Sequence, residues 1–488
     1  MNFVPSLAVS GKAAGQFFTP ESVAKSLVQW VLRSPADVLI DPSCGDGALL
    51  AHHPQSRGIE LDPYSAWVAR ERVPSAAIDC TDFFTWAADT GERFDCAAGN
   101  PPFIRYQSFK GLSKNAAAAI CQAVGVKLSG LTSTWPAFLI ATASLLKPGG
   151  RMAFVVPAEI GHAPYAKELL EYLLRAFSTV HVIAIREKLF PRLSQDCWIL
   201  YCDGRGGTTP DIRFSRIDRF EPSAEPPVPD EVVRWSTLMR EWRGRLRPLL
   251  ISNDARERYL TISTGPSAIR FGDFAKIGIG YVSGDNEFFH LTPSQARFHQ
   301  IPTEYLVPTV RRGRSLQSNV VDQHMLERWH AADEPCLLLN LPPTGELPET
   351  VSRYLATDQG HEASNSYKCR VRRPWYSVPG VSRPDYFLQY MSGADVRLAR
   401  NDAGAVCTNS VHAVHLRDAQ KARKALSTWG SDYTKLSCEL EGHPLGGGML
   451  KLEPREAGRI GFISEGLVLP RLIFAEALSV MRRWRHQT

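Results

Sequence analysis

The sequence lacks the cysteine patterns of a disulfide framework or a metal site. Its ten cysteines are scattered over 488 residues, with no C-x-x-C pair and no such pair followed by H-x-x-x-H. We therefore expect no bound metal. We also expect reduced thiols, as in a cytoplasm.

Long hydrophobic runs and a charged-then-apolar leader are absent as well. These absences argue against secretion and membrane insertion, so the sequence predicts a cytoplasmic protein with no membrane partner. Charge of one sign is not in large excess, because 56 Lys and Arg face 50 Asp and Glu, for a formal net charge of +6. This balance is compatible with a polyanionic partner, but any nucleic-acid site must be a local basic patch.

The chain has 44% hydrophobic and 22% charged residues, which is the composition of a globular protein. Its length of 488 residues suggests two or three domains. Up to about residue 200, short apolar runs alternate with amphipathic stretches, which predicts a doubly wound, mostly parallel α/β sheet covered by helices. Strands are predicted at Val38–Ile40, Gly58–Leu61, Ala76–Ile78, Cys96–Ala98, Met152–Val156, Val180–Ile185 and Cys197–Tyr201, and helices at Glu21–Leu32, Tyr64–Arg72, Trp135–Leu146 and Ala166–Phe177.

The pattern changes after Asp203, where GRGGTTP and PSAEPPVPDE predict a linker or surface excursion. From about Tyr259 onward, many short strand-like segments are joined by turn signals, with helical stretches at Asp418–Trp429 and Arg471–Trp484. This pattern predicts a mixed, β-rich second domain. We accordingly expect domains at residues 1–235 and 236–488.

Acidic residues follow the first three predicted strands. Asp41 begins DPSCGDG, whose two glycines let the backbone approach a ligand closely. Glu60, in GIELDP, could accept hydrogen bonds from both hydroxyls of a ribose, or could equally cap the following helix. Asp82 could accept from an adenine amino group while Phe83 lies against the ring. The spacing is not G-x-G-x-x-G and no Lys-Ser or Lys-Thr follows, which disfavours dinucleotides and a P-loop.

A fourth predicted strand ends in CAAGNPPFIR. Two prolines cannot continue a strand ladder, and they stiffen the backbone beyond it. Asn100 and Phe103 are thereby presented at the carboxyl edge of the sheet, where ligands bind in open α/β folds. Taken alone, NPPF could equally be an ordinary rigid loop. Together with three acidic strand ends, it favours an adenosyl-type ligand.

With these motifs the chain resembles the S-adenosylmethionine-dependent amino-methyltransferases of DNA, and among them the gamma-class, TaqI-like N6-adenine enzymes. The motif order, with GQFFTPESVAKSLVQW first and a recognition region last, defines that class. The resemblance implies a seven-stranded class I methyltransferase sheet and S-adenosylmethionine as cofactor. The cofactor-binding residues that it implies are Phe18, Thr19, Pro20, Asp41, Ser43, Cys44, Gly45, Glu60, Asp82, Phe83 and Asn100.

The resemblance further implies that Asn100, Pro101, Pro102 and Phe103 form the catalytic N-P-P-[YF] motif. An exocyclic adenine nitrogen is a poor nucleophile because its lone pair is delocalised into the ring. Acceptors on Asn100 and Pro101 would favour a tetrahedral, electron-rich nitrogen, and this preference strengthens in the transition state. The sulfonium is already an activated donor, so neither a metal nor a covalent nucleophile is required.

The target base must leave the duplex to reach such a site. Aromatic faces stabilise an unstacked base, so Phe103 is predicted to stack on it. Phe190, in EKLFPRLSQDCWIL, resembles a second stacking aromatic of the family, although it could instead anchor a loop to the core.

In the C-terminal half, GDFAKIGIGYVSGDNEFFHL, CTNSVHAVHL and GGGMLKLEP resemble stretches of the family's target-recognition domains. Two basic clusters are the candidates for contacts with DNA phosphates, although a run of charge is often only a solvated face. They comprise Arg311, Arg312, Arg314, Lys368, Arg370, Arg372 and Arg373.

The sequence therefore predicts a site-specific DNA methyltransferase that modifies adenine N6 in duplex DNA. We expect a nucleoid-associated monomer, with a separate restriction endonuclease as a partner to look for. One alternative is a protein glutamine N-methyltransferase, since such enzymes also carry N-P-P-Y, although they lack a large trailing domain and the upstream turn of Phe18, Thr19 and Pro20, which the resemblance implies to be a lid over the methionine end of the cofactor. The other is cytosine-N4 methylation, which would favour Ser or Asp in place of Asn100.

Overall fold

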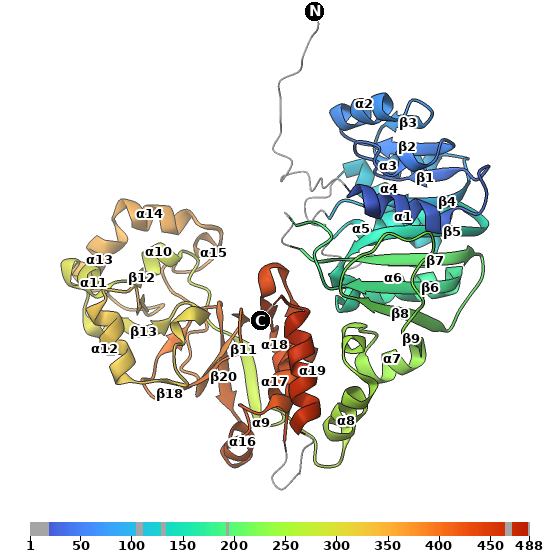
Figure 1. Ribbon diagram of the computed structural model, residues 1–488. Helices are drawn as coiled ribbons and strands as arrows, with labels where there is room; N and C mark the ends of the chain where they lie inside the picture. Colours follow the sequence, from blue (N-terminus) through green and yellow to red (C-terminus); the bar gives the residue numbers. More distant parts are fainter. Residues whose placement is uncertain (1–18, 104–110, 128–132, 192–194, 464–470, 487–488) are drawn as a thin grey trace, which may run out of the picture. The chain divides into compact units, whose positions relative to one another are not determined.

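The computed structural model describes residues 19–103, 111–127, 133–191, 195–463 and 471–486. The chain divides into two compact units, residues 1–250 and 251–488 (Figure 1). Phe18, one of the predicted cofactor residues, lies outside the described ranges.

In the described residues of the first unit, one nine-stranded mixed sheet has the order β3-β2-β1-β4-β5-β7-β6-β8-β9. Neighbouring strands are parallel except for the pairs β5–β7, β6–β7 and β8–β9. The strands are β1 (Leu39–Asp41), β2 (Ser56–Glu60), β3 (Ala77–Cys80), β4 (Phe94–Gly99), β5 (Leu146–Pro157), β6 (Phe177–Ile185), β7 (Cys197–Arg205), β8 (Asp211–Ile217) and β9 (Glu231–Arg234).

The α-helices of the first unit that the structure describes are α1 (Glu21–Val31), α2 (Pro63–Arg72), α3 (Phe83–Asp89), α4 (Gly111–Ala123), α5 (Trp135–Leu145), α6 (Pro164–Ala176) and α7 (Trp235–Trp242). Helix α1 packs on β4 and β5, helix α5 on β5, and helix α6 on β6. Val23, Leu27 and Trp30 of α1 are buried in one hydrophobic cluster with Ala98 of β4 and Val155 of β5. Their helical spacing gives α1 the apolar face that this packing requires.

Strands are present at all seven predicted positions, but the sheet has nine strands rather than seven. The two additional strands, β8 and β9, lie in the stretch after Asp203 that the sequence predicted as a linker or surface excursion. Ile212 and Phe214 of β8 are fully buried, which is the alternation of a half-buried strand. The Gly- and Pro-rich segments on either side concealed this short alternation.

In the described residues of the second unit, the strands form four sheets. The largest contains β11 (Ala275–Ile279), β20 (Val411–Leu416), β16 (Tyr386–Gln389), β18 (Leu398–Asn401) and β14 (Val320–Val321). The others contain β12 (His290–Leu291), β15 (Leu337–Leu339), β13 (Leu306–Val310) and β19 (Val406–Cys407); β17 (Met391–Ser392), β22 (Leu450–Lys451) and β21 (His443–Pro444); and β10 (Ile269–Arg270) with β23 (Gly461–Phe462).

Helices separate these strands more often than the sequence predicted. They are α8 (Asn253–Thr264), α9 (Phe271–Phe274), α10 (Asn286–Phe289), α11 (Pro293–Phe298), α12 (Gln323–Ala331), α13 (Glu349–Leu355), α14 (Asp358–Asn365), α15 (Tyr367–Arg370), α16 (Ala419–Leu426), α17 (Asp432–Glu441), α18 (Pro454–Ala457) and α19 (Arg471–Arg483). Ser252, Asp322 and Ser431 cap α8, α12 and α17, and these caps are signals that could have located these three of the unpredicted helices.

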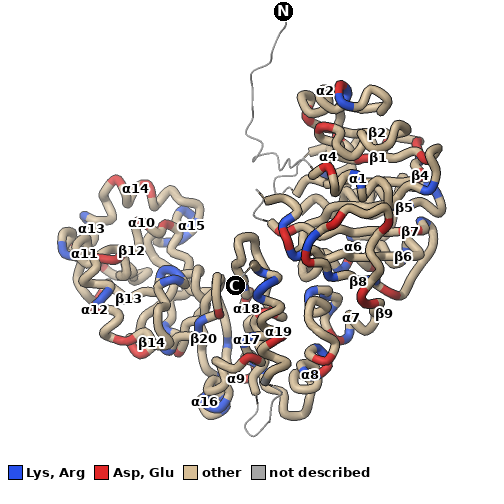
Figure 2. Tube along the Cα trace, in the orientation of Figure 1, with Lys and Arg blue, Asp and Glu red and all other residues tan. Residues whose placement is uncertain are grey.

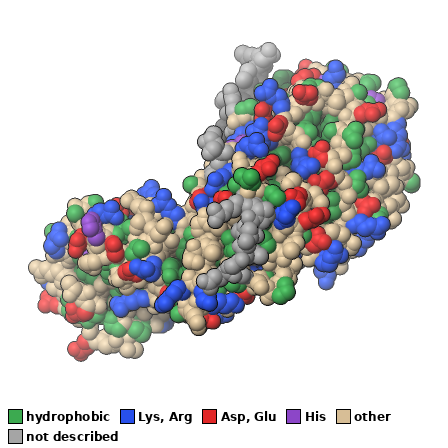
Figure 3. Space-filling view, turned by 60° about the horizontal axis from the view of Figure 1, so that its bottom comes forward, with side chains coloured by type: hydrophobic (Ala, Val, Ile, Leu, Met, Phe, Trp, Pro, Cys, Tyr) green, Lys and Arg blue, Asp and Glu red, His purple; other side chains and the backbone are tan. Residues whose placement is uncertain are grey.

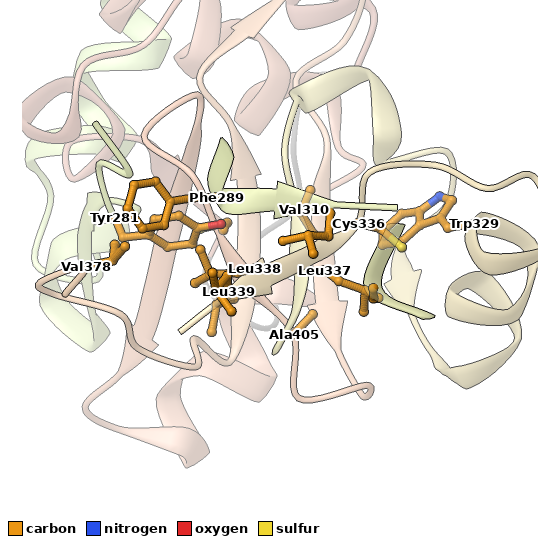
Figure 4. Packing of buried hydrophobic residues seen from close by; sticks show 14 of the residues in the cluster. Tyr281, Phe289, Val310, Trp329, Cys336, Leu337, Leu338, Leu339, Val378 and Ala405 are labelled. Carbon is orange, nitrogen blue, oxygen red and sulfur yellow. The ribbon is translucent and has the colours of Figure 1, made fainter. Parts of the chain in front are cut away.

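One hydrophobic cluster of the second unit joins its β-strands to these helices. Tyr281 and Phe289 lie at one end of the view in Figure 4, and Trp329 of α12 lies at the other, with Leu338 and Leu339 of β15 between them. The core of this unit is thus assembled from short elements that are distant in sequence.

Candidate active site

The predicted acidic residues and Asn100 follow parallel strands that lie side by side. Strand β1 pairs with both β2 and β4, so Asp41 at the end of β1 lies between Glu60 at the end of β2 and Asn100 just after β4. The carboxyl ends of parallel strands meet at one edge of a sheet. The fold therefore brings these three residues to the same edge.

Asp41 is fully buried beneath the loop that follows β1. Its Oδ1 accepts a hydrogen bond from the Ser43 backbone N–H at 3.1 Å, and its Oδ2 has no hydrogen-bond partner among the described residues. Burial, helped by the nearby negative charges of Glu60 and Asp46, raises the pKa of this carboxyl to about 8. A buried carboxyl with an unpaired oxygen fits a cationic ligand, such as the ammonium group of S-adenosylmethionine.

Glu60 ties the loop after β1 to the end of β2. Its Oε2 accepts from the Gly45 backbone N–H at 2.9 Å, and its Oε1 accepts from the Asp62 backbone N–H at 2.8 Å. The N-terminal cap of α2 is Asp62, which accepts from the Ser65 backbone N–H, so the capping alternative for Glu60 is wrong. Burial raises the pKa of Glu60.

Cys44 lies beneath the same loop and packs against β2. A Cβ atom added at Gly58 would come within 2.7 Å of the Cys44 Sγ, so a larger residue there would force this side chain to move. Burial raises the pKa of the Cys44 thiol well above its usual value. The structure therefore gives Cys44 a packing position in a cluster with Leu50 and Ala66.

Asp82 and Phe83 lie where α3 begins. Asp82 caps the helix by accepting from the Thr85 backbone N–H at 3.0 Å, and its Oδ2 accepts from the Ser113 hydroxyl at 2.6 Å. The Phe83 ring is buried and stacks on Phe138 of α5, with ring centroids 5.3 Å apart and planes 10° apart. Sequence reasoning missed Ser113 and Phe138, because neither belongs to a motif.

The NPPF loop follows β4 directly. Pro101 is buried, and Asn100, Pro102 and Phe103 are partly exposed. The loop contacts the loop that follows β1 through the Ser43 hydroxyl, which donates to the Asn100 carbonyl at 3.5 Å. It also contacts the start of α5.

Phe103 packs against a hydrophobic cluster that includes Phe190. Phe190 is 7% exposed, a burial that also suits the loop-anchor alternative. Thr19 is buried and Pro20 occupies the N-cap position of α1, so this part of the predicted lid leads directly into the first helix.

The cations in the two basic clusters of the second unit differ in their exposure and in their contacts. The exposed ones include Arg312, Arg314, Lys368, Arg370 and Arg373. Figure 2 shows cations at α15, and on the face shown in Figure 3 basic and acidic side chains are interspersed rather than segregated.

The remaining two cations contact segments that are distant in the sequence. Arg372 donates to the backbone carbonyls of Val282 and Ser283, each at 2.6 Å. Arg311 pairs with Glu287 at 3.4 Å. The structure thus divides a set of cations that the sequence could not distinguish.

Metal sites and membrane spans are both absent from the described ranges. These ranges hold no group of three or more His, Cys, Asp or Glu side chains that could bind a metal ion. No helix in the same ranges combines the length and hydropathy needed to cross a membrane.

Three family models match successive parts of the chain. Residues 5–58 match the N-6 DNA Methylase model, residues 66–190 the Eco57I restriction-modification methylase model, and residues 244–472 the C-terminal domain of the type II methyltransferase M.Eco57I. Together they cover most of both units.

Curated relatives span nearly the whole chain. It is 21% identical to the type II methyltransferase M.AccI of Acinetobacter calcoaceticus, over 97% of this chain and 90% of that protein. It is 24% identical to the type II methyltransferase M.XamI of Xanthomonas campestris pv. amaranthicola, over 92% of this chain and 84% of that protein.

Among solved structures, a DrdV–DNA complex determined by cryo-electron microscopy matches 83% of this chain with a TM-score of 0.51 and 10% identity. The match covers 49% of that protein, so the chain spans about half its length. This likeness concerns the fold alone. By the family models and the curated relatives, the chain is similar to the Eco57I-like N6 DNA methylases of type II restriction-modification systems, and its cofactor is S-adenosylmethionine.

Proposed function

We propose that this chain transfers a methyl group to the N6 amino group of an adenine in a specific duplex DNA sequence, as a gamma-class, TaqI-like enzyme. The observation that carries the proposal is the position of the NPPF loop. Asn100 follows β4 directly, and its backbone carbonyl accepts from Ser43, in the loop that follows Asp41 and its unpaired Oδ2. Methyl donor and methyl acceptor would therefore be held by adjoining loops.

Each part of this edge has a role in the proposed reaction. Bound S-adenosylmethionine supplies an activated methyl group, and Asp41 would hold its ammonium end. Glu60, at the end of β2, would accept hydrogen bonds from the ribose hydroxyls. Asn100 and the Pro101 carbonyl would accept the two hydrogens of the adenine amine, which raises the electron density on N6 as the bond to carbon forms. Holding donor and acceptor in line contributes a large proximity effect.

The target adenine would be flipped out of the duplex and stacked on Phe103, with Phe190 as the second aromatic candidate. Residues 251–488 would read the DNA sequence, with the exposed cations of the two basic clusters on its phosphates. Adenine is favoured over cytosine N4 because position 100 is Asn. DNA is favoured over a protein glutamine because residues 244–472 match the C-terminal domain of a type II methyltransferase.

Base-resolution sequencing of modified DNA tests this proposal. DNA would be taken from a host that lacks its own adenine methylation, expressing either the chain or the empty vector. We expect N6-methyladenine at one recurring short sequence in the first sample only. N4-methylcytosine, or no modified base at all, would overturn the assignment. The separate partner expected in a restriction-modification system would be a restriction endonuclease that cuts the same sequence when it is unmethylated. Co-expression of this chain should protect the host DNA from that endonuclease.

A further inference from the structure

The NPPF loop has few hydrogen-bond donors of its own. Pro101 and Pro102 have no backbone N–H, so half of the tetrapeptide cannot be anchored by donating to the protein around it. Part of the anchoring therefore falls to its carbonyl oxygens. Two side-chain hydroxyls reach them: Ser43 donates to the Asn100 carbonyl at 3.5 Å, and Thr134 donates to the Pro102 carbonyl at 3.2 Å.

Thr134 makes this contact with the Pro102 carbonyl in place of a helix-capping hydrogen bond. It occupies the N-cap position of α5, where a threonine hydroxyl commonly accepts from a backbone N–H of the first helical turn. In the structure its side chain forms no capping hydrogen bond. The side chain is 1% exposed, so its hydroxyl cannot turn to water either. The hydroxyl therefore bonds the NPPF loop and does not cap the helix.

The start of α5 is a rigid support for this contact. Trp135 donates through its indole N–H to the Glu159 carboxylate at 3.0 Å, which fixes the first turn. One turn further on, Phe138 stacks on Phe83, which follows Asp82 at the predicted adenine end of the cofactor site. The helix therefore contacts both the NPPF loop and the predicted cofactor side.

The two anchored carbonyls lie on either side of the Pro101 carbonyl. No donor reaches this central oxygen from the described residues. Pinning its two neighbours fixes the direction in which the central carbonyl points. We propose that Thr134, together with Ser43, is a positioning residue that aims the Pro101 carbonyl at the target amine. This inference rests on the proposed function, since it assigns a support to the acceptor of that reaction.

The test compares Thr134→Val with Thr134→Ser in the full chain. Valine matches threonine in shape but cannot donate, whereas serine keeps the hydroxyl. The assay is transfer of radiolabelled methyl groups to unmethylated genomic DNA, with kcat and KM measured for each substrate. We expect kcat of Thr134→Val to fall roughly 10- to 100-fold with little change in KM, because small misplacements of a reacting group cost about this much. Thr134→Ser should recover most of the rate.

Calorimetric affinity for S-adenosylmethionine and the melting temperature provide the controls, and both should stay near the wild-type values in Thr134→Val. If this variant does not fold, Ser43→Ala removes the other hydroxyl and should also lower kcat. The inference is overturned if Thr134→Val keeps the wild-type kcat, or if Thr134→Ser loses as much as Thr134→Val. A wild-type chain that methylates no adenine would overturn the proposed function itself, which is a different result.

Discussion

Residues 1–250 are built around one large sheet, whereas residues 251–488 divide their described strands among four small ones. In the first unit, parallel strands carry Asp41, Glu60 and Asn100 to a common edge, so residues far apart in sequence meet through regular geometry. In the second unit, short strands and helices alternate, and neighbouring cations have different environments. In the first unit, the place of a strand-end motif can therefore be inferred from the sequence. In the second unit, the sequence does not show which cations are free to contact a partner.

The largest effect is expected from Asn100, the residue on which the chemistry of the first unit most depends. Asn100→Ala should lower the rate of methyl transfer by roughly 100- to 1,000-fold, the usual cost of removing a donor or acceptor that stabilises developing charge. Cofactor affinity should stay nearly intact. Asn100→Asp should lose less, because a carboxylate still accepts a hydrogen bond. Radiolabelled transfer beside a calorimetric titration measures both, and full activity of Asn100→Ala on duplex DNA would contradict the NPPF assignment.

Phe103 tests whether a ring face is needed beside Asn100. Stacking of a base on an aromatic side chain contributes roughly 1–3 kcal/mol, so Phe103→Ala should slow transfer by about 5- to 150-fold. Phe103→Trp should keep substantial activity. The loss in Phe103→Ala should shrink on a duplex with a mismatched target adenine, whose unstacking costs less. Equal activity of the alanine and tryptophan variants would remove the ring from the mechanism.

Asp41 offers a pH-dependent test of the cofactor site. The folded chain holds the Asp41 proton up to about pH 8, whereas an unfolded aspartate loses it at about pH 4. The free energy of unfolding should therefore fall as pH rises through this window. A bound ammonium group favours the carboxylate, so cofactor binding at pH 7 should release up to about one proton per molecule.

Asp41→Asn should abolish this proton release and weaken cofactor binding roughly 10- to 100-fold, as expected for the loss of a charged hydrogen bond. Calorimetry in two buffers of different ionisation enthalpy counts the released protons. Identical proton release by wild type and Asp41→Asn would show that another group titrates.

The smallest effects come from a matched pair in the second unit. Arg373 is exposed and donates to the carbonyls of Arg370 and Arg372 beside it, whereas Arg372 donates to the carbonyls of Val282 and Ser283 in a distant segment. Arg373→Ala should lower the slope of log binding constant against log salt by about 0.9, the share of one phosphate contact. Arg372→Ala should instead destabilise the unit by roughly 1–3 kcal/mol, because two carbonyls lose their donor.

Filter binding across a salt series and urea unfolding distinguish the two arginines. If Arg372→Ala changes the salt slope and leaves stability unaltered, the sequence-based grouping of the two as phosphate contacts is right and the structural division is wrong.

The sequence by itself determined seven of the nine strand positions described in the first unit, and the motifs that follow them. Alternation of apolar runs and helical stretches is a local signal, and parallel pairing turns each strand end into a known place at one edge. For that reason the amino-acid pattern alone is enough to place Asp41, Glu60 and NPPF together. The two extra strands could not be predicted, since the apolar alternation of β8 is short and lies between Gly- and Pro-rich segments.

Only the tertiary structure decided which side chains support that edge. Thr134 reaches Pro102 across 32 positions in the sequence, and Ser113 reaches Asp82 across 31. No sequence pattern marks either residue. The local sequence around a Ser or Thr in or beside a helix is the same whether its hydroxyl caps the helix, faces water or bonds a distant loop. Arg372 likewise looks like its neighbours until its carbonyl partners are seen. Such contacts depend on the packing of distant segments, which no local pattern encodes.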